Sequence, residues 1–314
     1  MSRKALIIGA SGGVGGAVAS ALVRHGWQVI GLSRVERPAR DGIEWRVGDA
    51  MSAEDLRRAA QGVDVIFHGA NPPKYRNWDK VCVPMVKNAI AAAEAVNARL
   101  VFPGTVYNYG PDAGELVPEQ AAQHPQSRKG AIRVAMEAEL EAFANRGGRV
   151  LIVRAGDFFG GNAPKSWFQG ALIKPGKPVT DMSYPGDPSL GHDWAYLPDL
   201  AETFALLLDR EEKLAVFERF HFQGHWLTGA EMAAALRRAA GKPDVPVKRF
   251  PWWAMKLASP FVGFCREVLE MRYLWQRPLR LDNRKLAAFL GAEPHTPLDE
   301  AVRHSLIRVG CLPA

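Results

Sequence analysis

The 314-residue sequence contains only three cysteines, Cys82, Cys265 and Cys311. They lie far apart, and none belongs to a Cys-x-x-Cys pair or to a His/Cys spacing that binds zinc. A disulfide framework and a structural zinc site are therefore excluded as interpretations, and no metal is predicted.

The sequence also lacks a long hydrophobic run. No stretch of about 18 apolar residues occurs, and the apolar run near the start stops at Gly9, too early for a signal peptide. We therefore expect a soluble, cytoplasmic protein with no membrane partner. The most apolar part of the second half, 250–275, is interrupted by charged residues and Pro260, which favours an amphipathic lid or a homodimer face.

A dedicated nucleic-acid surface is missing as well. The 40 basic and 33 acidic residues give a net charge of +7, but no basic run is long enough to form a stripe. No nucleic-acid partner is predicted. A hydrophobic content of 47% is sufficient for a sizeable core.

The first half of the chain alternates short apolar runs with amphipathic segments, which predicts βαβ units and a parallel sheet. The fold class is thus α/β, a Rossmann-type doubly wound sheet with a smaller C-terminal lobe. We expect a dinucleotide-binding domain over 1–160 and a substrate lobe over 161–314 that interleaves with the sheet. The predicted strands are 5–8, 28–32, 43–47, 63–68, 100–103 and 150–154. The predicted helices are 15–25, 53–60, 78–96, 132–146, 199–208, 229–240, 252–275, 283–290 and 298–306.

A glycine-rich turn follows the first predicted strand and opens the first helix. Such a turn lets backbone N–H groups approach a pyrophosphate at the positive end of the helix. Because this context is the one that the fingerprint requires, the turn predicts dinucleotide binding. Its residues are Gly9, Ala10, Ser11, Gly12, Gly13, Val14 and Gly15.

The G-x-x-G-x-x-G spacing resembles that of the extended short-chain dehydrogenase/reductases, the family of UDP-galactose 4-epimerase. Further segments continue the resemblance in order along the chain. It implies that Asp49, with Ala50, contacts the adenine. It also implies that the adenosine ribose and diphosphate are supported by Gly69, Ala70 and Asn71, and that Gly156 and Phe158 lie beside the nicotinamide. His192, Asp193, Trp194, Tyr196 and Asp199 resemble a late R-D-F/W-x-Y/V-x-D-L-A signature.

The end of the second predicted strand indicates which dinucleotide is bound. An NAD site has an acidic residue here that accepts hydrogen bonds from the ribose 2′-OH. This chain has Ser33 followed by Arg34, and a hydroxyl with a guanidinium suits a 2′-phosphate. NADP(H) is therefore predicted in preference to NAD(H), and Arg37 is a further candidate for binding the 2′-phosphate.

The resemblance breaks at the catalytic positions. The family has a Ser or Thr after the fifth strand, which Thr105 matches, and a Y-x-x-x-K pair on the next helix. Here Lys129 takes the place of the tyrosine and Arg133 that of the lysine. The string from Lys129 to Arg133 resembles the K-x-x-I-R of isoflavone-reductase-like NADPH reductases, which implies a catalytic lysine.

Two interpretations of Lys129 remain open. In the first, Lys129, Thr105 and Arg133 form the catalytic site. The charge of Arg133, together with burial, then disfavours a second cation at Lys129, which suits this lysine to acid/base catalysis. In the second, Lys129 only holds the cofactor, and the protein is a catalytically inactive NADP(H) sensor.

Aromatic residues are frequent in the part of the chain expected to bind substrate, among them Phe158, Trp167, Trp194 and Trp252. They favour the reduction of a carbonyl or enone on a small apolar or aromatic substrate. The enzyme alternative is a sugar-nucleotide epimerase or dehydratase. The substrate itself is not predicted.

Overall fold

A computed structural model describes residues 3–72, 77–163 and 166–313. The chain forms two compact units, which we call the first and the second unit. The first comprises Met1–Asn108, Arg128–Arg154 and Ala201–Phe220, and the second comprises Tyr109–Ser127, Ala155–Leu200 and His221–Ala314. Residues 109–127, 155–160 and 201–220 thus belong to the other unit from the one expected from the sequence.

The first unit is built on a seven-stranded sheet in the order β11-β7-β5-β4-β1-β2-β3. β1 pairs in parallel with both β2 and β4, so the strand order reverses at β1, which is where doubly wound sheets bind ligands. The predicted Rossmann-type fold is confirmed. The strands are β1 (Lys4–Ile8), β2 (Gln28–Ser33), β3 (Ile43–Val47), β4 (Val65–His68), β5 (Arg99–Thr105), β7 (Val150–Ala155) and β11 (Phe217–Phe222).

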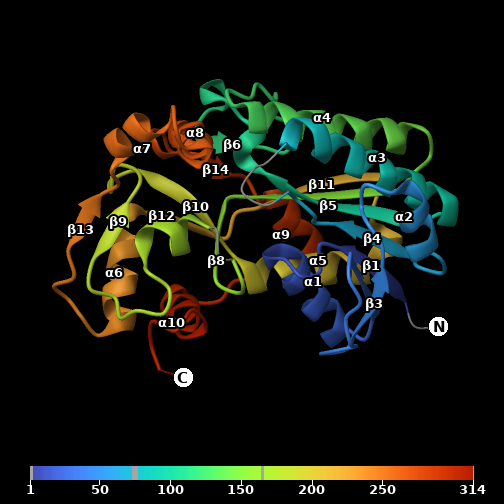
Figure 1. Cartoon of the computed structure of the whole chain (residues 1–314), viewed down its shortest axis with the longest axis horizontal. Helices are drawn as coiled ribbons and strands as arrows, with labels where there is room; N and C mark the ends of the chain where they lie inside the picture. The colour runs from blue at the N-terminus through green and yellow to red at the C-terminus, as the bar shows by residue number, and fades with distance from the viewer. Residues whose placement is uncertain (1–2, 73–76, 164–165, 314) are drawn as a thin grey trace. The chain divides into compact units, whose positions relative to one another are not determined.

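Helices cover both faces of this sheet (Figure 1). The apolar side chains of α2 (Ala53–Ala59), α3 (Trp78–Val96) and α4 (Arg128–Asn145) share one core with those of the strands. On the other face lie α1 (Gly13–Arg24) and α5 (Leu197–Asp209), where Phe204 packs edge-on against Phe67 at 5.2 Å. Burial on both faces explains why the sequences of the central strands β1, β4 and β5 are almost continuously apolar.

The described residues of the second unit form short strands and helices. β8 (Asp157–Phe159), β10 (Gly191–Tyr196) and β12 (His225–Thr228) form a three-stranded sheet. Two-stranded sheets pair β9 (Met182–Tyr184) with β13 (Val247–Arg249), and β6 (Leu116–Val117) with β14 (Arg280–Leu281). The helices are α6 (Gly229–Ala240), which contacts α10 (Leu298–Arg308), together with α7 (Trp252–Ala258), α8 (Gly263–Leu269) and α9 (Arg284–Leu290). Short helical turns are η3 (Pro111–Ala113), η4 (Phe168–Leu172) and, in the first unit, η5 (Glu211–Lys213).

The single helix predicted over 252–275 is wrong. The chain instead forms α7 (Trp252–Ala258), α8 (Gly263–Leu269) and η6 (Arg272–Trp275). Pro260 lies in the break between α7 and α8, because proline has no N–H to donate and disfavours helical geometry at the preceding residue.

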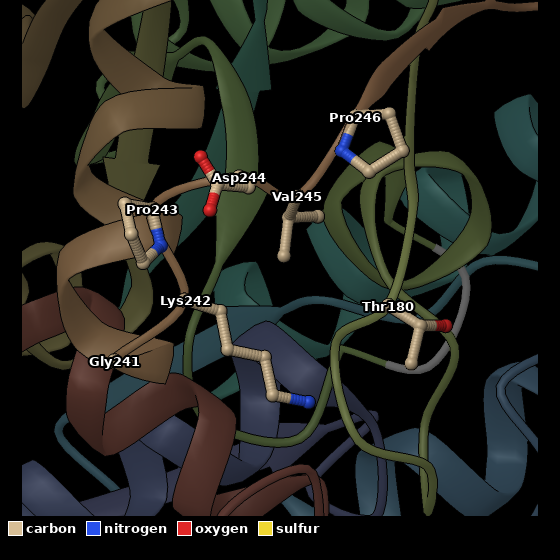
Figure 2. Close-up of a pocket in the computed structure, with 7 residues that line it drawn as sticks. All are labelled: Thr180, Gly241, Lys242, Pro243, Asp244, Val245 and Pro246. Carbon is tan, nitrogen blue, oxygen red and sulfur yellow. The ribbon is translucent and has the colours of Figure 1, made fainter.

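A hollow of about 450 Å³ lies beyond the end of α6 in the second unit (Figure 2). None of the residues predicted to bind cofactor or to react lines it. Its lining consists of Thr180, Gly241, Lys242, Pro243, Asp244, Val245 and Pro246. Across the described residues, no helix is long and apolar enough to cross a membrane.

Candidate cofactor and active site

The glycine-rich turn joins β1 to α1 at very close backbone distances. Gly9 has φ of +94°, and a Cβ on it would lie 2.9 Å from the backbone nitrogen of Ala70. A Cβ on Gly15 would lie 2.3 Å from the Gly9 carbonyl oxygen. Both positions therefore require glycine, and the turn packs against the segment that follows β4.

The first turn of α1 is open to a ligand. Gly12 is its N-cap residue and provides no side-chain cap, while Ser11 and Gly12 are both exposed and Val14 is half-buried. Unpaired N–H groups at a helix N-terminus attract an anion. This glycine cradle fits the diphosphate of a dinucleotide.

At the end of β2, Ser33 is bonded to a neighbouring arginine. The Arg37 Nε donates to the Ser33 Oγ at 3.0 Å, and the Arg37 guanidinium lies over the Trp45 ring at 5.0 Å. Arg34 is exposed beside them. Two arginines thus accompany the hydroxyl where a carboxylate would mark an NAD site.

The segments after β3 and β4 carry the residues assigned to the adenosine. Asp49 is exposed, and its Oδ1 accepts from the Met51 N–H at 2.9 Å, while Ala50 is buried. Gly69 and Ala70 are half-buried, and Asn71 is exposed. All these segments belong to the first unit, as does the glycine turn.

α4 begins at Arg128, four residues earlier than predicted, so its first two turns include both Lys129 and Arg133. Both side chains are buried, with 2% of Lys129 and 7% of Arg133 exposed. Their spacing of four places them on one helix face. Thr105, also buried, ends β5, and the turn η2 (Val106–Asn108) that follows it contacts α4.

Arg133 extends towards β5. Its guanidinium lies 5.3 Å from the Phe102 ring and 5.4 Å from the Trp78 ring, and its Nη1 is 3.5 Å from the Pro103 carbonyl oxygen. Pro103 is two residues before Thr105. Arg133 therefore links the Lys129 face of α4 to the strand end that carries Thr105.

A buried ion pair that sequence inspection missed lies further along α4. The Arg154 Nε donates to the Glu137 Oε1 at 3.0 Å, the Arg154 Nη2 to Oε2 at 2.5 Å, and the Asn108 Nδ2 to Oε1 at 2.9 Å. A Cβ on Gly104 would lie 2.4 Å from the Arg154 Cγ, so this glycine makes room for the pair. Glu137 thus ties α4 to the ends of β5 and β7.

His68, at the end of β4, is a neutral buried imidazole. Burial, and next the charge of Arg133, lower its pKa to about 3. Its ring is stacked over Phe102 with centroids 6.1 Å apart. Since Phe102 also contacts Arg133, the ends of β4 and β5 and the start of α4 meet in one aromatic and cationic cluster.

The model of the NAD dependent epimerase/dehydratase family matches residues 5–221, most of the chain and all seven strands of the sheet up to β11. The chain belongs to this family. Its cofactor is accordingly a nicotinamide dinucleotide, which agrees with the glycine cradle. No curated protein matches the sequence.

Solved structures share the fold of this epimerase/dehydratase family member at low identity. A candidate epimerase from Burkholderia cenocepacia J2315 is 20% identical over 99% of both chains, with a TM-score of 0.78. UDP-N-acetylglucosamine 4-epimerase from Bacillus cereus is 19% identical over 98% of this chain and 99% of its own, with a TM-score of 0.73. UDP-glucuronic acid 4-epimerase from the same organism, in complex with NAD, is 17% identical over 98% and 96%, with a TM-score of 0.76.

The two remaining predicted cofactor residues of this family member, Gly156 and Phe158, lie in the second unit. A Cβ on Gly156 would lie 2.3 Å from the Asp193 carbonyl oxygen, so glycine is needed for close packing against β10. Phe158 is half-buried and pairs with Ala195 across β8 and β10.

His192 and Asp193, which belong to the late signature recognised in the sequence, are buried polar residues of the second unit. Both lie on β10. The His192 Nε2 is 2.8 Å from the Asp157 Oδ2, and its ring stacks on Trp275 at 4.0 Å. Asp193 accepts from the Leu281 N–H at 2.6 Å, and burial raises the pKa of Asp193 well above its usual value. Partners this distant in sequence leave no local pattern.

Proposed function

We propose that this chain is an NADP(H)-dependent oxidoreductase that reduces a carbonyl or enone on a small apolar or aromatic substrate. The observation that carries the proposal is the buried Lys129 on α4, at the position where the resemblance places a catalytic tyrosine. Arg133 lies on the same helix face, and η2, the turn after Thr105, packs against the helix.

A nicotinamide dinucleotide held by the glycine turn and the end of β2 would supply a hydride to the substrate carbon. Lys129 then donates a proton to the oxygen that develops negative charge, and the Thr105 hydroxyl donates a hydrogen bond to the same oxygen. Hydride and proton together convert the carbonyl into an alcohol. Arg133 acts as a positioning residue, since its guanidinium is engaged with Phe102, Trp78 and Pro103.

The preference for NADP(H) rests on Ser33, Arg34 and Arg37. A guanidinium forms charge-assisted hydrogen bonds with a 2′-phosphate, worth roughly 1.5–3 kcal/mol each, whereas an NAD site presents a carboxylate at this strand end. The exposed Arg34 and the Arg37 already bonded to Ser33 are therefore proposed to bind that phosphate.

Binding titrations test the cofactor preference. NADPH should bind at least about tenfold more tightly than NADH, and Arg34→Asp should reverse the order. Arg40→Asp is the matched control, because Arg40 is also exposed on the loop after β2 but contacts Asp41. Equal affinity of the parent protein for both cofactors would refute the assignment.

Lys129→Met tests the catalytic role. It should reduce turnover of a carbonyl or enone found by screening by roughly 10²–10⁴, while NADPH affinity changes by a few fold at most. Lys129→Arg retains the charge and should not restore the proton donor. Unchanged activity in Lys129→Met would exclude this lysine from the chemistry.

Two other outcomes would replace the proposal. Interconversion of UDP-glucose and UDP-galactose by the parent protein would favour a sugar-nucleotide epimerase. Loss of NADPH binding in Lys129→Met, with no turnover in carbonyl, enone and UDP-sugar screens, would favour a cofactor sensor.

A further inference from the structure

The second unit exposes five large apolar side chains within a twelve-residue stretch. Phe261 is 88% exposed, Trp253 74% and Leu257 72%, and Val262 and Phe264 are about half exposed. We call these five residues the α7–α8 patch. They present on the order of 600 Å² of apolar surface, the upper end of what a monomer exposes in one patch.

The patch spans α7, the turn after it and the start of α8. α7 and α8 contact each other and lie side by side in Figure 1. On the inner side, the Trp252 Nε1 donates to the Pro185 carbonyl oxygen at 2.7 Å, and Cys265 and Val268 are buried. Trp253 and Leu257, four residues apart, share the outer face of α7. The exposure is thus a property of the folded second unit.

The stretch of sequence that contains the patch carries a positive charge. Between residues 248 and 266 the sequence has four basic residues and no acidic one. Arg249, Lys256 and Arg266 are exposed, while Lys248 is paired with Asp181 at 3.2 Å. Exposed aromatic and aliphatic side chains bordered by Lys and Arg are the combination that binds the interface of an anionic bilayer.

We propose that the α7–α8 patch docks the protein peripherally on an anionic lipid bilayer, with the five apolar side chains in the interface and Arg249, Lys256 and Arg266 near the headgroups. This differs from the expectation of no membrane partner, which rested on the absence of a spanning segment and on the charged residues that interrupt 250–275. A second copy is disfavoured because a two-fold contact would bring the same positive set against itself.

Vesicle co-sedimentation of the full chain tests the proposal. The protein should bind vesicles containing about 30% phosphatidylglycerol and should bind phosphatidylcholine vesicles much more weakly, with binding that falls as salt rises. Trp253→Ser/Phe261→Ser should reduce binding by at least about tenfold. Lys256→Glu/Arg266→Glu should reduce binding to the anionic vesicles selectively.

Matched controls lie in the first unit. Val216→Ser replaces another exposed apolar residue, and Arg146→Glu/Lys213→Glu makes the same charge change on exposed positions. Both should bind vesicles as the parent does. All variants should keep the parent's NADPH affinity and melting temperature, which separates this proposal from the proposed activity.

Absence of vesicle binding by the parent protein would overturn the proposal. So would equal losses in the patch and control variants. A parent dimer that becomes monomeric in Trp253→Ser/Phe261→Ser, with no vesicle binding in either, would assign the patch to self-association instead.

Discussion

Glu137→Gln perturbs the ion pair that holds α4 against the strands. Arg154 has no exposed side-chain surface and Glu137 has 2%, so the substitution leaves a buried guanidinium without a balancing charge. Removing one partner of a buried pair typically costs about 3–5 kcal/mol of unfolding free energy. Because glutamine retains one acceptor oxygen for Arg154 or Asn108, we expect about 3 kcal/mol.

Urea unfolding at neutral pH measures this cost. Glu139→Gln is the matched control, since it is the same change on the same helix, in a pair with Lys87 at 3.0 Å that is largely solvent-exposed. Exposed pairs contribute roughly 0–1 kcal/mol. Glu137→Leu/Arg154→Met removes both members of the pair and should recover part of the loss, because the Arg154 charge is no longer left unpaired; Asn108 and Arg219 still lose their contacts with Glu137.

The result also bears on activity. Glu137 lies two helical turns beyond Lys129, so a loosened α4 should lower turnover in Glu137→Gln even where the protein remains folded. If Glu137→Gln costs no more than Glu139→Gln, the pair does not hold the helix and the reasoning is refuted.

Two further predictions concern the first unit. Gly15→Ala should destabilise the protein by roughly 1–3 kcal/mol and abolish NADPH binding, because its Cβ would meet the Gly9 carbonyl oxygen at 2.3 Å; normal binding by a folded variant would contradict this. Burial lowers the pKa of His25, but hydrogen bonds to Asp209 and Glu202 outweigh it and raise that pKa above 6.5. The protonated His25 stabilises the fold fully below the unfolded-state pKa, and this contribution is lost as the pH rises through the raised pKa of the folded state. The unfolding free energy should therefore decline less between about pH 6 and pH 9 in His25→Gln than in the parent.

The sequence alone determined most of the first unit. Apolar runs separated by amphipathic segments gave six strands of the sheet close to their observed bounds, because strands buried on both faces are apolar throughout. The cofactor turn was equally visible, since Gly9, Gly12 and Gly15 lie within seven residues and the backbone itself contacts the phosphate. The replacement of the tyrosine by Lys129 could be recognised for the same reason, because the helix motif that contains it is one continuous stretch of sequence.

Only the tertiary structure decided which distant side chains meet. Glu137 and Arg154 are 17 residues apart, and His192 and Asp157 are 35 apart, so no local pattern marks either pair. The apolar run over 250–275 contained both buried and exposed residues, and its break near Pro260 determined which ones face outward. The periodicity of a segment indicates which of its residues can be buried. The residues that pair with its charges or pack against its rings and its apolar face belong to other parts of the chain.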